Sequence, residues 1–232
     1  MRLPVVRRGL GLCLLLGWSV DAHAAGGAYA VDDAAIGKQG ECQVESWLSF
    51  ASNGSFVGVT QPVCVLQFGV PVEITTAFQA ARADGDWAAF AGLQAKAILV
   101  PVEPNHVGVG LTLASHFNVT KGEAAFSLIN VPITIKVHDQ LRLNVNGGGL
   151  FDDAISGTYV TWGAGFEWDF AKHLTLISEI YGQVGNPSFP EPRVQAGLRY
   201  SPIGTIDLDV IYGHNIAGDN AQWMTVGLTS RF

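Results

Sequence analysis

Charged side chains within otherwise apolar segments are the residues of this chain whose types and spacing could do chemistry. Side chains an even number of positions apart lie on the same face of a strand, as Asp207 and Asp209 would. The residues expected to share the inward, pore-lining face of such strands are Lys96, Lys136, Arg142, Glu167, Glu179, Arg193, Arg199, Asp207, Asp209 and Arg231. Facing rows of opposite charge can create a transverse field across a pore, or they can fill a narrow interior with ion pairs. Both interpretations remain open.

The same residue types do not form a convincing catalytic constellation. Ser115 and His116 are adjacent in a predicted strand, so their side chains point to opposite faces and cannot form a nucleophile–base pair. A set that could place an acid–base pair at a barrel rim is Asp207, Asp209, His214 and Asp219. An ion pair in the wall plus a solvated histidine explains that set more simply. No HExxH or CxxC spacing occurs, so we predict no metal, no cofactor and no enzyme activity.

Two cysteines indicate an exported protein. Cys42 and Cys64 lie symmetrically about Asn53, within the turn signal Ser-Asn-Gly-Ser. A hairpin that turns there places the cysteines opposite each other, and an oxidising compartment favours a disulfide between them. Two buried free thiols are the alternative.

The elements that must position these residues are strands, because apolar and polar residues alternate along most of the chain. Proline and glycine weaken the second and third strands, so a barrel of ten strands remains an alternative to twelve. The twelve predicted strands are 42–51, 57–68, 72–82, 87–99, 107–117, 125–137, 141–151, 158–168, 174–182, 193–200, 206–213 and 223–232.

Composition decides which class of β-protein this is. The chain is 48% hydrophobic and 14% charged with a net charge of −7, and its mean hydropathy is +0.27. These values exclude a disordered or coiled-coil protein and disfavour a nucleic-acid binder. After residue 24, no apolar run approaches the roughly 20 residues that a transmembrane helix needs. Apolar residues dispersed at alternate positions therefore predict an all-β, transmembrane, antiparallel up-and-down barrel.

The N-terminus has the pattern of an export signal. Arg2, Arg7 and Arg8 precede an apolar stretch, and Ala22-His23-Ala24 supplies small residues at a cleavage site. We expect 1–24 to be a cleaved signal peptide, 25–41 a periplasmic segment and 42–232 a barrel in the outer membrane of a Gram-negative cell.

Two resemblances refine this expectation. The chain ends on Phe232 after apolar residues at alternate positions, and this ending resembles the signal read by the barrel-assembly machinery, although Ser230 departs from it. The segments 161–168 (TWGAGFEW), 174–179 (LTLISE), 195–200 (QAGLRY) and 206–210 (IDLDV) resemble the outer-membrane channel family described as "MetA-pathway of phenol degradation". The resemblance implies transport of small molecules and supplies no catalytic residues.

The predicted function is therefore a passive outer-membrane channel or transporter for small molecules. Its expected partners are outer-membrane lipid, the barrel-assembly machinery and a small-molecule solute, with no nucleic acid. Inward glycines such as Gly163 and Gly197 would leave room on part of the wall and favour an open lumen. A closed structural barrel and an outer-membrane hydrolase are the alternatives.

Overall fold

Twelve β-strands form the whole of the regular structure in the computed structural model, which describes residues 27–104, 106–153, 156–185, 192–217 and 221–232. Among these residues, no helix is long and apolar enough to cross a membrane. The strands are β1 (Cys42–Ala51), β2 (Phe56–Gln67), β3 (Pro71–Ala83), β4 (Asp86–Val100), β5 (Val107–Asn118), β6 (Glu123–His138), β7 (Leu141–Asp152), β8 (Gly157–Ala171), β9 (Leu174–Val184), β10 (Arg193–Ile203), β11 (Ile206–Asn215) and β12 (Gln222–Arg231).

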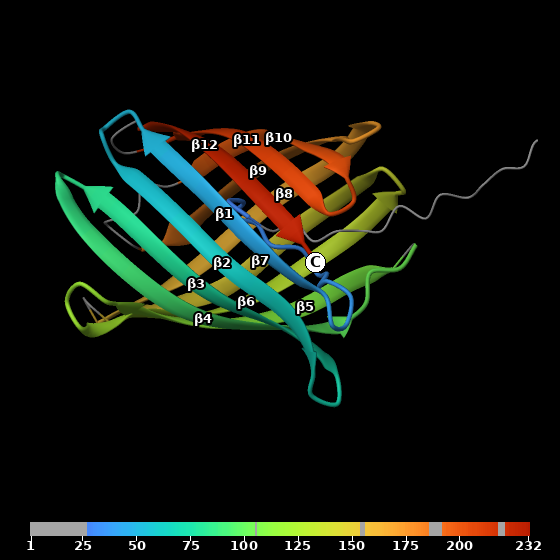
Figure 1. Cartoon of the computed structure of the whole chain (residues 1–232), viewed down its shortest axis with the longest axis horizontal. Coiled ribbons are helices and arrows are strands. Elements are labelled where there is room, and N and C mark those ends of the chain that lie inside the picture. Colours follow the sequence, from blue (N-terminus) through green and yellow to red (C-terminus); the bar gives the residue numbers. More distant parts are fainter. Residues whose placement is uncertain (1–26, 105, 154–155, 186–191, 218–220) are drawn as a thin grey trace, which may run out of the picture.

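Each strand pairs antiparallel with its sequence neighbours, and β1 pairs with β12 to close the barrel (Figure 1). The count of twelve is confirmed, and the ten-strand alternative is wrong. Strands β2 and β3 are complete, and they pair with each other before and after Pro62. Proline is tolerated because the remaining ladder positions hold the two strands in register.

An even number of strands brings both ends of the barrel chain to one side. The Cys42 N–H donates to the Phe232 carbonyl, and the Phe232 N–H donates to the Cys42 carbonyl. We call this side the near end. Its joins are 68–70, 101–106, 139–140, 172–173 and 204–205, and the opposite joins define the far end.

Burial in this barrel is inverted relative to a water-soluble protein. Large apolar side chains at alternate positions of β11, such as Leu208 and Val210, are 43% and 49% exposed on the outer surface. Between them Asp207 and Asp209 are only 2% and 3% exposed, because their side chains point into the lumen. The alternation seen in the sequence therefore sorts residues between an apolar exterior and a polar interior, as lipid requires.

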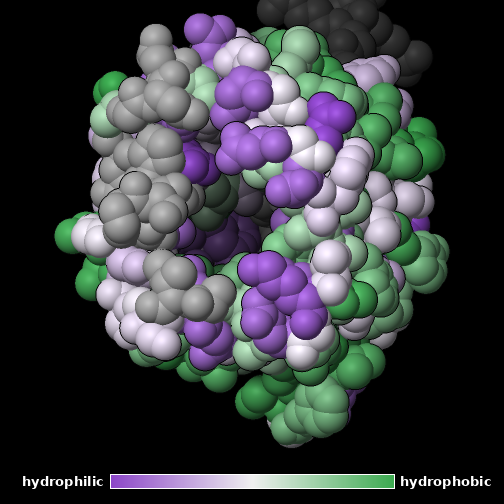
Figure 2. Space-filling view, turned by 90° about the vertical axis from the view of Figure 1, so that its left-hand side faces the viewer, coloured by the Kyte–Doolittle hydropathy of each residue, from purple (hydrophilic) through white to green (hydrophobic). Residues whose placement is uncertain are grey.

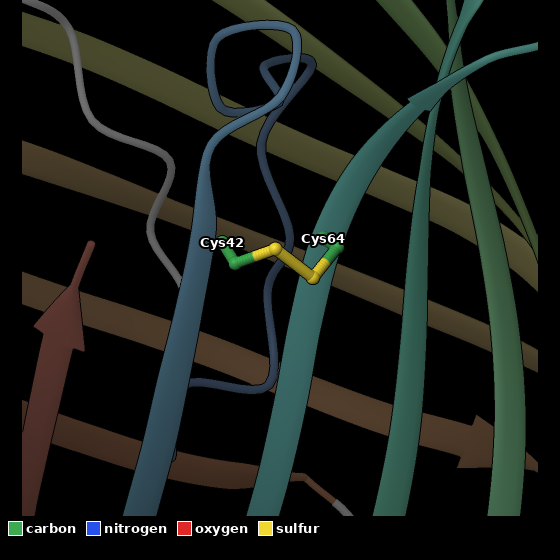
Figure 3. Close-up of a disulfide and its surroundings, with 2 residues drawn as sticks. All are labelled: Cys42 and Cys64. Carbon is green, nitrogen blue, oxygen red and sulfur yellow. A yellow bond between two sulfur atoms is a disulfide. The ribbon is translucent and has the colours of Figure 1, made fainter.

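The first hairpin carries the predicted disulfide. In β1 and β2, Cys42 lies directly opposite Cys64, and their sulfur atoms are bonded (Figure 3). The turn between the strands contains Gly54 at a φ of 84°, a conformation that glycine adopts without steric cost. The hairpin is thus closed at the far end by its turn and at the near end by a covalent bond.

Residues 27–41 do not lie outside the barrel, as the predicted periplasmic segment would. We call this stretch the N-terminal segment. Its trace enters the lumen beside β1 and runs between the front and rear walls (Figure 1). Val31 and Ala34 are 2% and 1% exposed, and the segment bonds to side chains of most strands. The segment lies inside because polar side chains of the lumen supply the hydrogen-bond partners that its extended backbone needs.

Candidate functional site

The N-terminal segment is held in the lumen mainly by side chains of the barrel that bond to its backbone. Glu179 of β9 accepts the Ala30 N–H at 2.7 Å and the Val31 N–H at 2.9 Å, one with each carboxylate oxygen. The Ala34 N–H donates to the Thr134 hydroxyl of β6 at 2.8 Å. Further bonds reach β1 at Glu45, β3 at Glu73, β7 at Asn146 and β10 at Gln195. The segment therefore follows the inner circumference of the barrel.

A buried cation anchors the middle of the segment. The Lys96 ammonium group of β4 lies 2.7 Å from Asp32 Oδ1 and 3.3 Å from Asp33 Oδ1. Lys96 is 2% exposed and Asp33 is 1% exposed. Removing one partner of such a pair leaves an uncompensated buried charge. Lys96, predicted to line a pore, is thus committed to the N-terminal segment.

Two inward glycines make room for this segment and do not leave the lumen empty. A Cβ atom at Gly163 would lie 2.8 Å from Val31 Cγ2, and one at Gly197 would lie 2.6 Å from the Tyr29 hydroxyl. Both distances are too short for real carbon contacts. The expectation that these glycines favour an open lumen is therefore wrong at these two positions, because side chains of the N-terminal segment occupy the space.

Tyr29 links the segment to a wall of paired charges. Its hydroxyl donates to Asp209 Oδ1 at 3.4 Å, and its ring lies 5.4 Å from the Arg199 guanidinium carbon. Burial of the phenol, reinforced by the charge of Asp209, raises the pKa of Tyr29. The hydroxyl therefore keeps its proton and remains a donor.

Three arginines neutralise carboxylates along β7–β8 and β10–β12, which we call the paired wall. Arg142 lies 2.8 Å from Glu167, Arg199 lies 2.9 Å from Asp209 and Arg231 lies 2.6 Å from Asp207. Arg199 also donates a second hydrogen bond to Asp209 Oδ2. All six side chains point inward and pair across neighbouring strands. This arrangement is the ion-pair filling that was one of the two sequence interpretations.

The remaining predicted pore residues have other partners. Glu179 stands next to the strand that carries Arg193 and Arg199 but bonds to the N-terminal segment and to Gln195. Arg193 interacts with Tyr181 of β9. Lys136 lies at the near rim, 2.8 Å from Asp139. Its hydrogen bond and charge lower the pKa of Asp139.

A cavity of about 450 Å³ occupies the space that the N-terminal segment leaves. We call it the vestibule. Its lining includes residues close to the far ends of the strands, such as Leu150 and Gln183. Four residues of the N-terminal segment also line it: Gly27, Tyr29, Ala30 and Asp32. Seen from the far end, a hollow opens in the molecule and is rimmed by hydrophilic residues (Figure 2). The polar side chains along it are Asp32, Gln43, Glu45, Gln61, Glu73, Thr75, Gln94, Lys96, Thr112, Asn130, Asn146, Thr161 and Gln183.

The carboxylate of Glu45, the most distinctive group in the vestibule, was not among the predicted pore-lining residues. Glu45 of β1 is 3% exposed and accepts hydrogen bonds from the Gln43 and Gln61 amides, each at 2.7 Å. Gln43, Glu45 and Trp47 alternate with outward Val44 and Leu48 in the first strand. The period of two would have placed them inward.

The catalytic candidates are dispersed. Ser115 faces outward and accepts a hydrogen bond from Ser127, whereas His116 faces inward and stacks on Phe126. Asp207 and Asp209 are taken by arginines, His214 has the opposite parity on β11, and Asp219 lies outside the described residues. Within the described ranges, no group of His, Cys, Asp and Glu could hold a metal ion.

Solved structures with the same architecture are outer-membrane porins and channels. The KdgM porin superposes with a TM-score of 0.64 at 11% identity, over 82% of this chain and 99% of that one. The NanC porin gives 0.63 at 8% identity, over 81% and 98%. The COG4313 outer-membrane channel from Pseudomonas putida F1 gives 0.61 at 12% identity, over 86% and 98%. At such identities these likenesses establish the porin-like fold.

The sequence comparisons identify a family without a described function. The model of a family described as "Uncharacterised conserved protein UCP029691" matches residues 13–232. No curated protein matches the chain. The finer resemblance to the phenol-degradation channel family is not confirmed by these findings.

Proposed function

Since the chain belongs to this family of uncharacterised conserved proteins, we propose a function from its structure: a passive outer-membrane channel for small molecules. The vestibule is the observation that carries the proposal. A cavity of about 450 Å³ that is lined by hydrogen-bonding side chains has the size and polarity of a site for a small polar solute. A barrel that served only as a membrane anchor would not need such a space.

The N-terminal segment determines how wide the passage is. It lies inside the lumen beside the vestibule, with Gly37 bonded to Glu73 near one end and Gly27 bonded to Glu45 at the other. A solute must pass beside this segment or displace it. We therefore propose that the segment forms the constriction of the channel.

The same segment favours a second candidate function, a closed structural barrel. Val31 and Ala34 are buried, and Lys96 is paired inside the lumen. If the segment never moves and blocks the lumen fully, the protein transports nothing. The two candidates make opposite predictions about conductance.

Planar-bilayer recording separates them. The mature protein should give discrete conductance steps, and a variant that lacks residues 25–41 should give larger ones. Heat-modifiable gel mobility serves as the control that both proteins hold a folded barrel. Conductance only in the shortened variant would establish the closed barrel, and no conductance in either would overturn the channel proposal.

The cellular setting is part of the proposal. We propose export through a cleaved signal peptide at 1–24, insertion into the outer membrane of a Gram-negative cell by the barrel-assembly machinery, and no enzymatic activity. Phe232 remains the proposed assembly signal; its ring is 77% exposed and accessible to a receptor. Membrane fractionation with N-terminal sequencing tests the export step, and Phe232→Ala should lower the amount of assembled barrel.

A further inference from the structure

Two carboxylates of the vestibule are hydrogen-bonded only to neutral donors, although Glu73 lies opposite Lys96 in the β3–β4 ladder. Glu45 accepts hydrogen bonds only from neutral groups, namely the Gln43 and Gln61 amides and the Gly27 N–H. Among the described residues, Glu73 accepts one long bond of 3.4 Å from the Gly37 N–H and, like Glu45, takes part in no ion pair. By contrast, Lys96 and the three arginines of the paired wall are each bonded to carboxylates. Glu179 also forms no ion pair among the described residues, but its oxygens are occupied by the Ala30 and Val31 N–H groups and by Gln195.

An unpartnered hydroxyl accompanies these carboxylates. Thr75 follows Glu73 on the inner face of β3, is 4% exposed and lines the cavity. Its Oγ1 atom has no hydrogen-bond partner among the described residues. The hydroxyl borders the cavity, where a ligand or water can supply a hydrogen-bond partner.

The charges lie close enough to act together. Glu73 interacts electrostatically with Glu45 and Asp32 as well as with Lys96. One ammonium group, that of Lys96, interacts with Asp32, Asp33 and Glu73, so acidic side chains outnumber cationic ones in this cluster. Low-dielectric walls focus such a field into the cavity and concentrate cations there.

We infer that the vestibule binds a small organic cation carrying amine groups. The Glu45 and Glu73 carboxylates would accept its ammonium protons, the free Thr75 hydroxyl would add a polar contact, and the Trp47 ring, which also lines the cavity, favours cations over its face. A bare metal ion is a poorer occupant, because no group of His, Cys, Asp and Glu in the described residues is arranged to ligate one.

This inference rests on the proposed function for the route of the solute, but binding can be tested without transport. The probe is putrescine, with 1,4-butanediol as the neutral analogue and succinate as the anionic one. Calorimetric titration of the mature protein in detergent should show binding of putrescine alone. Glu73→Gln and Glu45→Gln should each weaken it about tenfold or more, as loss of a charge-assisted hydrogen bond does. Glu103→Gln, which removes an exposed charge at the near end, should leave it unchanged.

Bilayer measurements form the second arm. In a salt gradient the wild-type channel should prefer cations, putrescine should block it, and Glu73→Gln should reduce both effects. Anion preference, or equal binding of all three probes, would overturn the inference while leaving the channel intact. Putrescine binding in a protein that never conducts would overturn the channel and leave the binding site standing. If neither Glu45→Gln nor Glu73→Gln weakens putrescine binding, the amine binds elsewhere and the inference is wrong.

Discussion

The two walls of the lumen use the same residue types in different ways. On the paired wall, Glu167, Asp207 and Asp209 each form an ion pair with an arginine of the neighbouring strand. On β1–β3, which we call the vestibule wall, Glu45 and Glu73 face neutral donors. Ion pairing neutralises charge and fills space, whereas neutral donors hold a carboxylate in place and leave its charge available. The comparison separates residues that stabilise the barrel from those able to attract a solute.

The largest effect should follow from breaking a pair on the paired wall. Arg199→Met leaves Asp209 buried without its cation, and we expect the free energy of unfolding to fall by about 3–5 kcal/mol. Urea titration of the refolded barrel in micelles measures it. The double variant Arg199→Met/Asp209→Leu should recover most of the loss, because it removes both charges together. A single variant as stable as wild type would show that these pairs are not structural.

The stability of the vestibule wall should depend on its disulfide and not on ion pairs. Cys42 and Cys64 join β1 to β2 across a sequence separation of 22 residues. Replacing both by serine should lower the free energy of unfolding by about 3 kcal/mol, because the bond restricts the unfolded chain. Reductant should destabilise wild type and leave the double serine variant unchanged. Equal stability of the oxidised and reduced wild type would remove the disulfide from this role.

The N-terminal segment contacts both walls. The substitution Gly163→Ala tests how closely this segment packs against the barrel. The new Cβ atom would meet Val31, so we expect a loss of about 1–3 kcal/mol from overpacking together with larger conductance steps. Val31→Ala in the same chain should restore both quantities. If the second substitution restores neither, the clash lies in the wall itself.

The smallest effect on stability should come from the vestibule carboxylate. Glu45→Gln should change the free energy of unfolding by about 1 kcal/mol or less, since the Gln43 and Gln61 amides can rotate to offer oxygen in place of N–H. Cation selectivity should nevertheless fall. A large destabilisation with unchanged selectivity would show that Glu45 stabilises the barrel, as the carboxylates of the paired wall do, and does not attract cations.

Most of the barrel could be predicted from local pattern alone. A period of two assigns each residue of a strand to one face, so Asp207, Asp209 and Arg231 could be placed inside before any contact was known. The symmetry of Cys42 and Cys64 about Asn53 likewise defined the register of the first hairpin, because antiparallel pairs keep a constant sum of residue numbers. These features depend on near neighbours in the sequence or on a single turn.

The place of the N-terminal segment could not be predicted in this way. Residues 27–41 have no alternating pattern, and their partners are remote: Val31 bonds to Glu179, 148 residues further along the chain. The inward glycines were visible, but whether they left space or received a side chain depended on this segment. Glu45 is a different case, because the alternation around it was present and was overlooked.

Sequence by itself determined the alternation and the inward face of each strand, because these depend on side-chain direction along an extended backbone. The choice between ten and twelve strands needed the structure, because it depended on whether β2 and β3 pair as separate strands. Only the tertiary structure decided which charges cancel. Glu179 and Lys96 are used to hold the N-terminal segment, and the arginines neutralise the paired wall. Pairing depends on distances across the closed barrel and on a backbone that enters the lumen. Glu45 and Glu73 are left with neutral hydrogen-bond donors after those contacts are made.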